Sequence, residues 1–384
     1  MRLIRGRDGW WCITRAGTAL IPASLMREGQ LSAEGRRQVS EAGLDRALTP
    51  DHYSLTVVTT TQCNLGCSYC FQNVASPAPG TFAPPRIAQA TLGPDTLSAT
   101  AAFAARRMAE QGVSTLAVAL FGGEPLLNAA GCLAVLRACD RRVHTVGSMI
   151  SNGVLMTGPL AVRLAAAGLR AVQVTLDGPR ALHDVVRTTR AGRGTFDVIL
   201  ANVAAAQEQT DLDITLRVNV TAAALPGIEE LLRGAAAVTD PARTRFALGP
   251  VLSYGTGSGE PAGSGRPETL PAPDADRAAV GQAVRAYAVA RELGFKVAPP
   301  RDDHCDFCSV PDGRYGAVVN ADGALFSCWE SVGRPGYAVG TVADGYDDYP
   351  AGRWVTCGSL ARNGPALGRF ADALDAGLLD LLRR

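Results

Sequence analysis

Between about residues 52 and 252, short runs of β-branched residues alternate with alanine-rich segments whose apolar residues recur at helical spacing. This alternation is typical of parallel βαβ units, because each helix returns the chain to the same end of the sheet. The predicted strands are 55–60, 115–121, 144–150, 171–176, 214–220 and 245–251. The predicted helices lie near 95–112, 129–141, 160–167, 196–209 and 226–237. The pattern predicts an α/β fold built on a parallel sheet.

Unusual polar clusters follow the first four predicted strands, at residues 61–70, 122–125, 151–153 and 177–179. In parallel α/β architectures, reactive groups sit at the carboxyl ends of the strands. We therefore expect these clusters to meet in one functional site.

The flanking segments have simpler patterns. Residues 10–22 predict a hairpin around 15–17 that is followed by a short helix, and residues 274–293 predict an amphipathic helix. Residues 316–327, with Asp322-Gly323 at the turn, predict a second hairpin. Gly, Pro and Ser dominate residues 255–274, as in a linker or mobile loop. We therefore divide the chain into an N-terminal cap (1–50), a barrel (51–254), a linker (255–275) and a C-terminal domain (276–384).

Composition and charge narrow the class of protein. The 384 residues are 47% hydrophobic, enough to bury a sizeable core. Lys and Arg total 37 against 36 Asp and Glu, so charge gives no support for a nucleic-acid partner. No apolar run approaches the roughly 20 residues that span a bilayer, and the first residues lack a signal peptide. We expect a cytoplasmic protein without a membrane partner.

Ten cysteines in a chain with no export signal indicate metal binding rather than a disulfide framework. Cys12, Cys132 and Cys139 are predicted to pack in the core; the last two lie seven residues apart on one helix face. The other cysteines form two groups: Cys63, Cys67 and Cys70, and then Cys305, Cys308, Cys328 and Cys357.

The first group has three thiols and no fourth. Four thiolates saturate a four-iron cluster, so three leave one iron with an open position. The alternatives are a zinc site or buried thiols, but zinc would require a fourth Cys or His close in the sequence.

Three motifs resemble the radical S-adenosylmethionine superfamily: Cys63-x3-Cys67-x2-Cys70, the Gly-Gly-Glu tripeptide at 122–124, and VTLDGPRALHDVVR at 174–187. The last resembles the peptide-modifying and sulfatase-maturing branch, and the likeness spans roughly residues 52 to 255. The resemblance implies a partial (β/α)6 TIM-like barrel. It also implies a [4Fe-4S] cluster on Cys63, Cys67 and Cys70 whose open iron binds S-adenosyl-L-methionine through its amino and carboxylate groups, as a source of a 5′-deoxyadenosyl radical.

The resemblance also implies cofactor contacts. Glu124 would accept hydrogen bonds from the methionyl ammonium, with Gly122 and Gly123 allowing close backbone approach. Arg217 would pair with the methionyl carboxylate, helped by the hydroxyl of Thr175. The alternative for Arg217 is a salt bridge at a strand end.

Ser151, Asn152 and Asp177 would contact the ribose hydroxyls, and Phe71 would lie along the adenine. Asn-Gly and Asp-Gly also make turns without any ligand, and Phe71 could simply pack. For His183 and Asp184 we expect helix capping and local packing rather than acid–base chemistry.

The second group, with the stretch from residue 305 to 333, resembles the start of a SPASM domain, which carries two auxiliary clusters in peptide-modifying radical enzymes. The cysteine-rich block expected after residue 340 is missing, as in the shortened twitch variant. We therefore expect a small C-terminal iron–sulfur domain of a β-hairpin and helix, with one auxiliary [4Fe-4S] cluster on Cys305, Cys308, Cys328 and Cys357. That makes two clusters per chain; the alternative is a zinc knuckle.

The expected activity is hydrogen abstraction from a side chain of a ribosomally synthesised precursor peptide, giving a crosslink or other oxidative modification. Flavodoxin or ferredoxin would supply electrons, and the edge of the N-terminal hairpin could take a leader peptide. The alternatives are a twitch-type dehydrogenase of a small-molecule antibiotic pathway and a sulfatase-maturing enzyme. A redox sensor is the non-enzymatic alternative, although it has no need of Glu124 and Arg217.

Overall fold

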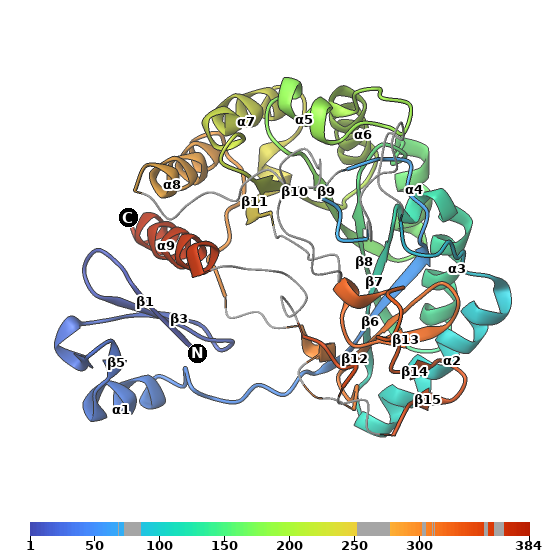
Figure 1. Cartoon of the computed structure of the whole chain (residues 1–384), viewed down its shortest axis with the longest axis horizontal. Helices are drawn as coiled ribbons and strands as arrows, with labels where there is room; N and C mark the ends of the chain where they lie inside the picture. Colours follow the sequence, from blue (N-terminus) through green and yellow to red (C-terminus); the bar gives the residue numbers. More distant parts are fainter. Residues whose placement is uncertain are drawn as a thin grey trace.

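The computed structural model describes residues 1–67, 69–72, 86–251, 277–301, 305–308, 310, 312–348, 352–356 and 365–384 (Figure 1). A sheet with helices along its outer side forms the larger part, and the N-terminal strands lie at one end of it. Cys357 and the predicted linker 255–275 lie outside the described residues, so the division of the chain at this linker stays a prediction.

The parallel part of the sheet contains all six predicted strands. Neighbouring strands follow chain order in reverse, β11-β10-β9-β8-β7-β6, and every pair among them is parallel. β6 begins three residues before the predicted strand, and the other ends differ by two residues or fewer. The strands are β6 (His52–Thr60), β7 (Thr115–Gly122), β8 (His144–Ser151), β9 (Leu169–Thr175), β10 (Asp213–Val220) and β11 (Thr244–Pro250).

Helices cover the outer face of this sheet and connect successive strands, as in a partial (β/α)6 barrel (Figure 1). The five helices predicted between the strands are confirmed, as is the helix that follows the predicted linker. The helices are α2 (Pro94–Gln111), α3 (Ala129–Asp140), α4 (Gly158–Ala166), α5 (Arg180–Val186), α6 (Phe196–Gln209), α7 (Ile228–Ala236) and α8 (Arg277–Glu292). Short 3-10 turns are η1 (Ala23–Leu25), η2 (Pro125–Asn128), η3 (Leu225–Gly227), η4 (Pro241–Arg243), η5 (Asp306–Cys308) and η6 (Trp329–Ser331).

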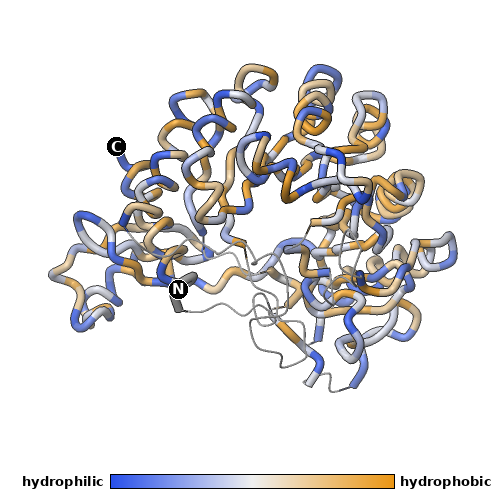
Figure 2. Tube along the Cα trace, turned by 45° about the horizontal axis from the view of Figure 1, so that its top comes forward, coloured by the Kyte–Doolittle hydropathy of each residue, from blue (hydrophilic) through white to orange (hydrophobic). Residues whose placement is uncertain are grey.

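The core lies between the sheet and these helices, and Figure 2 shows hydrophobic residues recurring along the trace. β6 is buried along nearly its whole length, as expected of a central parallel strand covered on both faces. Cys132 and Cys139 are buried on α3 and Cys12 is buried in β2, so their predicted packing role is confirmed. No helix among the described residues is long and apolar enough to cross a membrane.

The N-terminal segment forms a small sheet that packs on the last helix, α9 (Pro365–Leu382). The predicted hairpin is confirmed as β2–β3, and β1 adds a third antiparallel strand that the sequence pattern did not predict. The side chain of Trp11 donates to Asp380 Oδ1 at 2.8 Å, and Arg2 lies 2.9 Å from Asp375. The elements are β1 (Arg2–Arg5), β2 (Trp10–Ile13), β3 (Thr18–Ile21), β4 (Met26–Arg27), β5 (Gln30–Leu31) and α1 (Ala33–Glu41).

The second predicted hairpin is confirmed, but it is not a separate sheet. β12 (Gly316–Val319) pairs in parallel with β6 at the free edge of the barrel sheet, and β13 (Ala324–Phe326) pairs antiparallel with β12. Two short strands, β14 (Gly340–Thr341) and β15 (Gly345–Tyr346), extend the sheet. Cys328, two residues after β13, is thereby attached to the same sheet that carries the cysteine loop.

Candidate active site

The loop after β6 carries Cys63, Cys67 and Cys70, and it is tied to the barrel by backbone hydrogen bonds. Thr61 N donates to Ala90 O at 3.0 Å, and Gly66 N donates to Thr188 O at 3.1 Å. Burial raises the pKa of the Cys63 thiol and raises that of Cys67 to about 12. A thiolate at Cys63 or Cys67 therefore needs positive charge beside it.

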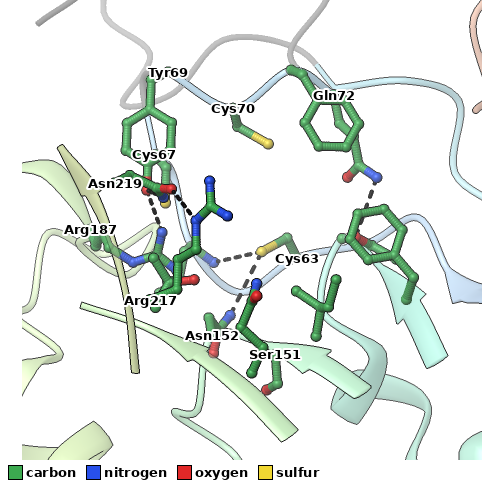
Figure 3. Close-up of a pocket in the computed structure, with 18 of the residues that line it drawn as sticks. Cys63, Cys67, Tyr69, Cys70, Gln72, Ser151, Asn152, Arg187, Arg217 and Asn219 are labelled. Atoms are coloured by element: carbon green, nitrogen blue, oxygen red, sulfur yellow. Dashed lines mark hydrogen bonds between the residues drawn. The ribbon is translucent and has the colours of Figure 1, made fainter. Parts of the chain in front are cut away.

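The three thiols line one cavity of about 310 Å³ at the carboxyl ends of the strands (Figure 3). This size suits a small-molecule ligand. Ten of the site residues predicted from the sequence line this cavity, the three cysteines among them; the others are Phe71, Gly122, Gly123, Ser151, Asn152, Thr175 and Arg217. Glu124 and Asp177 do not line it.

No group of three or more His, Cys, Asp or Glu side chains within the described ranges is arranged to hold a metal ion. Thiolates that bind different irons of one cluster do not converge on a single ion. The arrangement of the three thiols around a shared cavity is compatible with a four-iron cluster, each thiol binding a different iron.

Gly122 and Gly123 pack directly against the backbone of the cysteine loop. Gly123 N donates to Thr60 O at 2.9 Å, and Glu124 N donates to Gln62 O at 2.8 Å. A Cβ at Gly123 would lie 2.1 Å from Gln62 O, far inside van der Waals contact. Sequence reasoning assigned the glycines to a close approach of the cofactor; in the structure, the close approach they allow is that of the loop which carries the cysteines.

We expect Gly123→Ala to displace the cysteine loop and lower the iron content after anaerobic reconstitution, because backbone atoms cannot yield to the new methyl group. Overpacking of this kind costs about 1–3 kcal/mol in stability. Gly234→Ala on α7 is the matched control, since nothing lies within 4 Å of its added methyl group. Iron analysis of both variants checks the expectation, and normal iron loading of Gly123→Ala would contradict it.

Glu124 is fully buried, and both carboxylate oxygens accept hydrogen bonds from the protein. Oε1 accepts from Ser151 Oγ at 2.8 Å and from Leu126 N at 3.0 Å, and Oε2 accepts from Asn152 N at 2.7 Å. Desolvation raises its pKa, and these hydrogen bonds oppose the shift. Glu124 thus fastens the end of β8 to the end of β7. Its predicted contact with a methionyl ammonium stays a prediction.

Asn152 connects the hydrogen bonds of Glu124 to the first cysteine of the loop. Its side-chain Nδ2 donates to Asn64 Oδ1 at 2.8 Å and lies 3.9 Å from Cys63 Sγ, while Oδ1 accepts from Val154 N at 3.0 Å. Ser151 and Asn152 therefore make the turn contacts of the alternative interpretation and also face the cavity. Their predicted ribose contacts stay a prediction.

Arg217 extends from β10 into the cavity (Figure 3). Its Nε donates to Asn219 Oδ1 at 3.3 Å, and no described carboxylate lies within ion-pair distance of it. A glycine on the neighbouring strand, Gly249, makes room for the guanidinium, because a Cβ there would lie 1.9 Å from Nη2. The strand-end salt bridge, the alternative for this residue, is not formed among the described residues.

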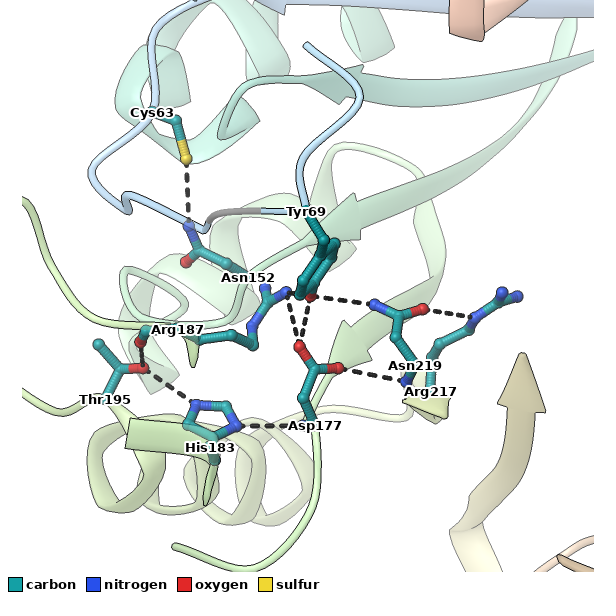
Figure 4. Close-up of polar contacts among 9 residues, drawn as sticks. All are labelled: Cys63, Tyr69, Asn152, Asp177, His183, Arg187, Thr195, Arg217 and Asn219. Atoms are coloured by element: carbon teal, nitrogen blue, oxygen red, sulfur yellow. Dashed lines mark hydrogen bonds and ion pairs between the residues drawn. The ribbon is translucent and has the colours of Figure 1, made fainter. Parts of the chain in front are cut away.

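A buried polar network that sequence reasoning missed lies beside the cavity (Figure 4). Tyr69 of the cysteine loop donates to Asp177 Oδ2 and accepts hydrogen bonds from Arg187 Nη1 and, at 3.1 Å, from Asn219 Nδ2. Arg187 and Asp177 form an ion pair at 3.4 Å with side chains 9% and 4% exposed. Through Asn219, the network links the cysteine loop to Arg217. Asp177 is therefore engaged within the protein, and its predicted ribose contact stays a prediction.

His183 and Asp184 pack and cap as expected. Asp184 Oδ1 accepts from Thr195 N at 2.7 Å and from Phe196 N at 2.9 Å, so it caps α6 rather than its own helix. His183 Nδ1 accepts from Asp177 N at 3.2 Å, which assigns the ring proton to Nε2, 3.0 Å from Thr195 Oγ1. Burial lowers the pKa of His183 to about 3.

We expect His183 to make folding less favourable in mild acid. The unfolded chain binds a proton at this residue below pH ~6.5, whereas the folded chain does so only near pH 3. The free energy of unfolding should therefore fall by up to about 1.4 kcal/mol per pH unit below pH ~6.5. Urea titrations between pH ~5 and ~7 check this: the pH slope should be smaller in His183→Gln, and an unchanged slope would contradict it.

Aromatic side chains, among them Phe71, Phe121 and Trp329, form one wall of the cavity that the three cysteines line. Phe71 stacks on Phe121 with ring centroids 6.2 Å apart, and Trp329 of η6 lies 5.7 Å from Phe121. Arg334 Nη2 donates to Phe71 O at 2.9 Å. The C-terminal segment thus contributes to the site, which sequence reasoning did not predict. The packing of Phe71 is observed, and its predicted position along an adenine stays a prediction.

The second cysteine group lies in this C-terminal segment. Cys308 and Cys328 are buried, and Cys305 is partly buried beside the same apolar cluster as Cys308. The chain that leads to Cys357 reaches this region: Trp354 Nε1 donates to Cys308 O at 3.2 Å, and Val355 N donates to Ser327 Oγ at 2.8 Å. Cys357 itself lies outside the described residues.

Comparison with known proteins agrees with this geometry. The sequence model of the radical SAM superfamily matches residues 57–227, which include the cysteine loop and extend past Arg217. Over these 171 of its 384 residues, the chain is similar to the radical SAM superfamily. No curated protein matches the chain in sequence.

Solved structures share the fold of this chain. Native anSMEcpe with bound AdoMet is 13% identical and has a TM-score of 0.63, over 86% of this chain and 98% of that chain. The complex of native anSMEcpe with AdoMet and the Kp18Cys peptide has a TM-score of 0.62 over the same shares, also at 13% identity. Streptococcus suis SuiB bound to the precursor peptide SuiA is 15% identical, with a TM-score of 0.51 over 91% of this chain and 73% of that chain.

The cavity of this protein fits the cofactors that the resemblance to the radical SAM superfamily implies. Its lining has three thiols and three arginines but no carboxylate among the described residues, so its arginines favour a negatively charged group on the ligand. Arg187 Nε and Arg86 Nε are buried without a hydrogen-bond partner among the described residues. The thiols therefore suit a cluster, and the arginine N–H groups suit a ligand that carries a carboxylate.

Proposed function

We propose that this protein is a radical S-adenosylmethionine enzyme that oxidatively modifies a side chain of a ribosomally synthesised precursor peptide. The observation that carries the proposal is the shared cavity at the strand ends, where three thiols face Arg217. Cys63, Cys67 and Cys70 would hold a [4Fe-4S] cluster with one open iron. The cluster supplies the electron that splits S-adenosylmethionine into methionine and a 5′-deoxyadenosyl radical.

The three arginines of the cavity differ in the partners that they have inside the protein. Arg187 is paired with Asp177 inside the protein, and Arg86 donates to Cys70 Sγ at 3.5 Å. Arg217 is the arginine of the lining that has neither a carboxylate nor a thiol as partner among the described residues. Arg217 is therefore the residue best suited to bind the methionyl carboxylate, with Thr175 beside it on the lining.

The protein also has to keep water from the reacting atoms. The aromatic wall of Phe71, Phe121 and Trp329 supplies a largely apolar surface to the cavity. We propose that adenine lies against this wall and that the substrate side chain enters beside Trp329.

An auxiliary [4Fe-4S] cluster on Cys305, Cys308, Cys328 and Cys357 is the second part of the proposal. Its support is the burial of Cys308 and Cys328 and the two hydrogen bonds that hold residues 354 and 355 against this region. Four thiolates would saturate this cluster, so its role would be to accept or relay the electron that the substrate loses.

A peptide substrate is proposed from the fold relatives that bind peptides, namely anSMEcpe with the Kp18Cys peptide and SuiB with its precursor SuiA. The edge strands of the N-terminal sheet, β1 and β3, would suit a leader peptide by strand addition. Flavodoxin or ferredoxin is the proposed reductant.

Anaerobic reconstitution followed by dithionite and S-adenosylmethionine tests the chemistry: the protein should release 5′-deoxyadenosine, which a redox sensor would not. Co-expression with a short reading frame next to its gene tests the substrate class. A mass loss in that peptide would support a peptide maturase, whereas turnover of a small alcohol or amine only would support the dehydrogenase alternative.

We expect Cys328→Ala to cleave S-adenosylmethionine but to lose turnover of the substrate, because the auxiliary cluster would act only after hydrogen abstraction. Its iron content should fall from about eight to about four atoms per chain. Paired measurements of 5′-deoxyadenosine and modified product check this. Equal loss of both products would contradict the auxiliary assignment.

A further inference from the structure

Arg86 holds a position that neither the family match nor the sequence motifs assign. It lies sixteen residues after Cys70 and lines the cavity with the three cysteines. Its Nη1 donates to Cys70 Sγ at 3.5 Å, and Nη2 donates to Gln72 Oε1. No carboxylate within the described ranges lies at ion-pair distance from Arg86, so its charge faces the thiols.

Gln72 fixes the direction of this guanidinium. Gln72 is 2% exposed, and its Nε2 donates to Gly122 O at 3.2 Å while its backbone oxygen accepts from Ile87 N at 3.0 Å. The side chain that orients Arg86 is thus anchored to both the glycine motif and the chain next to Arg86. A surface arginine would lose more side-chain entropy in keeping one such geometry.

We propose that Arg86, through its charge and its hydrogen bond to Cys70, raises the reduction potential of the cluster on Cys63, Cys67 and Cys70. This inference rests on the proposed function. Reduction adds one negative charge to the cluster, and a fixed cation beside it stabilises the reduced form more than the oxidised form. A hydrogen bond from an N–H group to a ligand sulfur acts in the same direction. Arg86 supplies both effects at Cys70.

The test compares redox titrations of the wild type, Arg86→Met and Arg86→Gln, followed by electron paramagnetic resonance. The signal that changes on addition of S-adenosylmethionine identifies the relevant cluster. At a fixed solution potential, the ratio of reduced to oxidised cluster should fall about tenfold in Arg86→Met. This equals a fall of ~59 mV in the reduction potential of a one-electron couple. Arg86→Gln, which keeps a donor but no charge, should shift in the same direction by less.

Arg163→Met on α4 is the matched control, because it removes an exposed arginine remote from the cavity and should leave the ratio unchanged. An unchanged ratio in Arg86→Met overturns the inference. Loss of iron from both Arg86 variants, or weaker S-adenosylmethionine binding at an unchanged potential, also overturns it, in favour of a structural or cofactor-binding role. If the wild type has no such signal, the proposed function fails instead.

Discussion

Replacement of Cys63, Cys67 and Cys70 by Ala is expected to abolish release of 5′-deoxyadenosine and to remove about four iron atoms per chain. The three thiols line one cavity, and burial raises the pKa of two of them, Cys63 and Cys67. Without the cluster there is no route for an electron to the cofactor. Product analysis by chromatography and iron analysis on the same sample measure the two effects.

A matched variant separates this effect from general damage. Cys139→Ala also removes a buried thiol, but Cys139 lies on α3 away from the cavity. It should keep its iron and its activity, with a modest loss of stability. Normal iron content in the triple variant would show that the metal is bound elsewhere.

Arg217→Met is expected to weaken binding of S-adenosylmethionine about 10- to 150-fold. A hydrogen bond to a charged group contributes about 1.5–3 kcal/mol, which corresponds to this range of dissociation constants. Arg217→Lys should lose less, because it keeps the charge but not the two-pronged geometry. Equilibrium binding to the reconstituted protein measures the change, and an unchanged dissociation constant would exclude Arg217 from cofactor binding.

Gly249→Ala provides an independent check on the same contact. Its methyl group would meet the tip of Arg217 rather than backbone atoms, so the guanidinium would move while the fold stays intact. We expect weaker cofactor binding without loss of stability. A variant that binds normally would show that the position of the guanidinium in this structure is not the one that matters.

The barrel was predictable because short buried apolar strands alternate with helical segments, and Gly122, Asn152 and Asp177 mark the ends of β7, β8 and β9. The cavity residues followed from the position of those ends. Arg217 was assigned from the family resemblance, yet Asn219 was missed although residues two apart on a strand share a face. That periodicity was the available signal for the Asn219 contact.

Other parts depend on contacts distant in sequence. The hydrogen bond from Arg334 to Phe71 joins segments 263 residues apart, and the pairing of β12 with β6 is equally remote. The sequence around each of these segments contains no signal that indicates its distant partner. α9 is different, because its apolar residues recur at helical spacing through Phe370, Leu374 and Leu378, and this pattern was overlooked.

The central claim is that an iron–sulfur cluster with one open iron sits on the cysteine loop and binds S-adenosylmethionine there. The most direct measurement is the electron paramagnetic resonance spectrum of the anaerobically reconstituted, reduced protein before and after addition of S-adenosylmethionine. We predict a [4Fe-4S] signal that changes shape on addition and is lost when the three loop cysteines are replaced. A folded protein that stays colourless and iron-free, with zinc on those cysteines, would contradict the account.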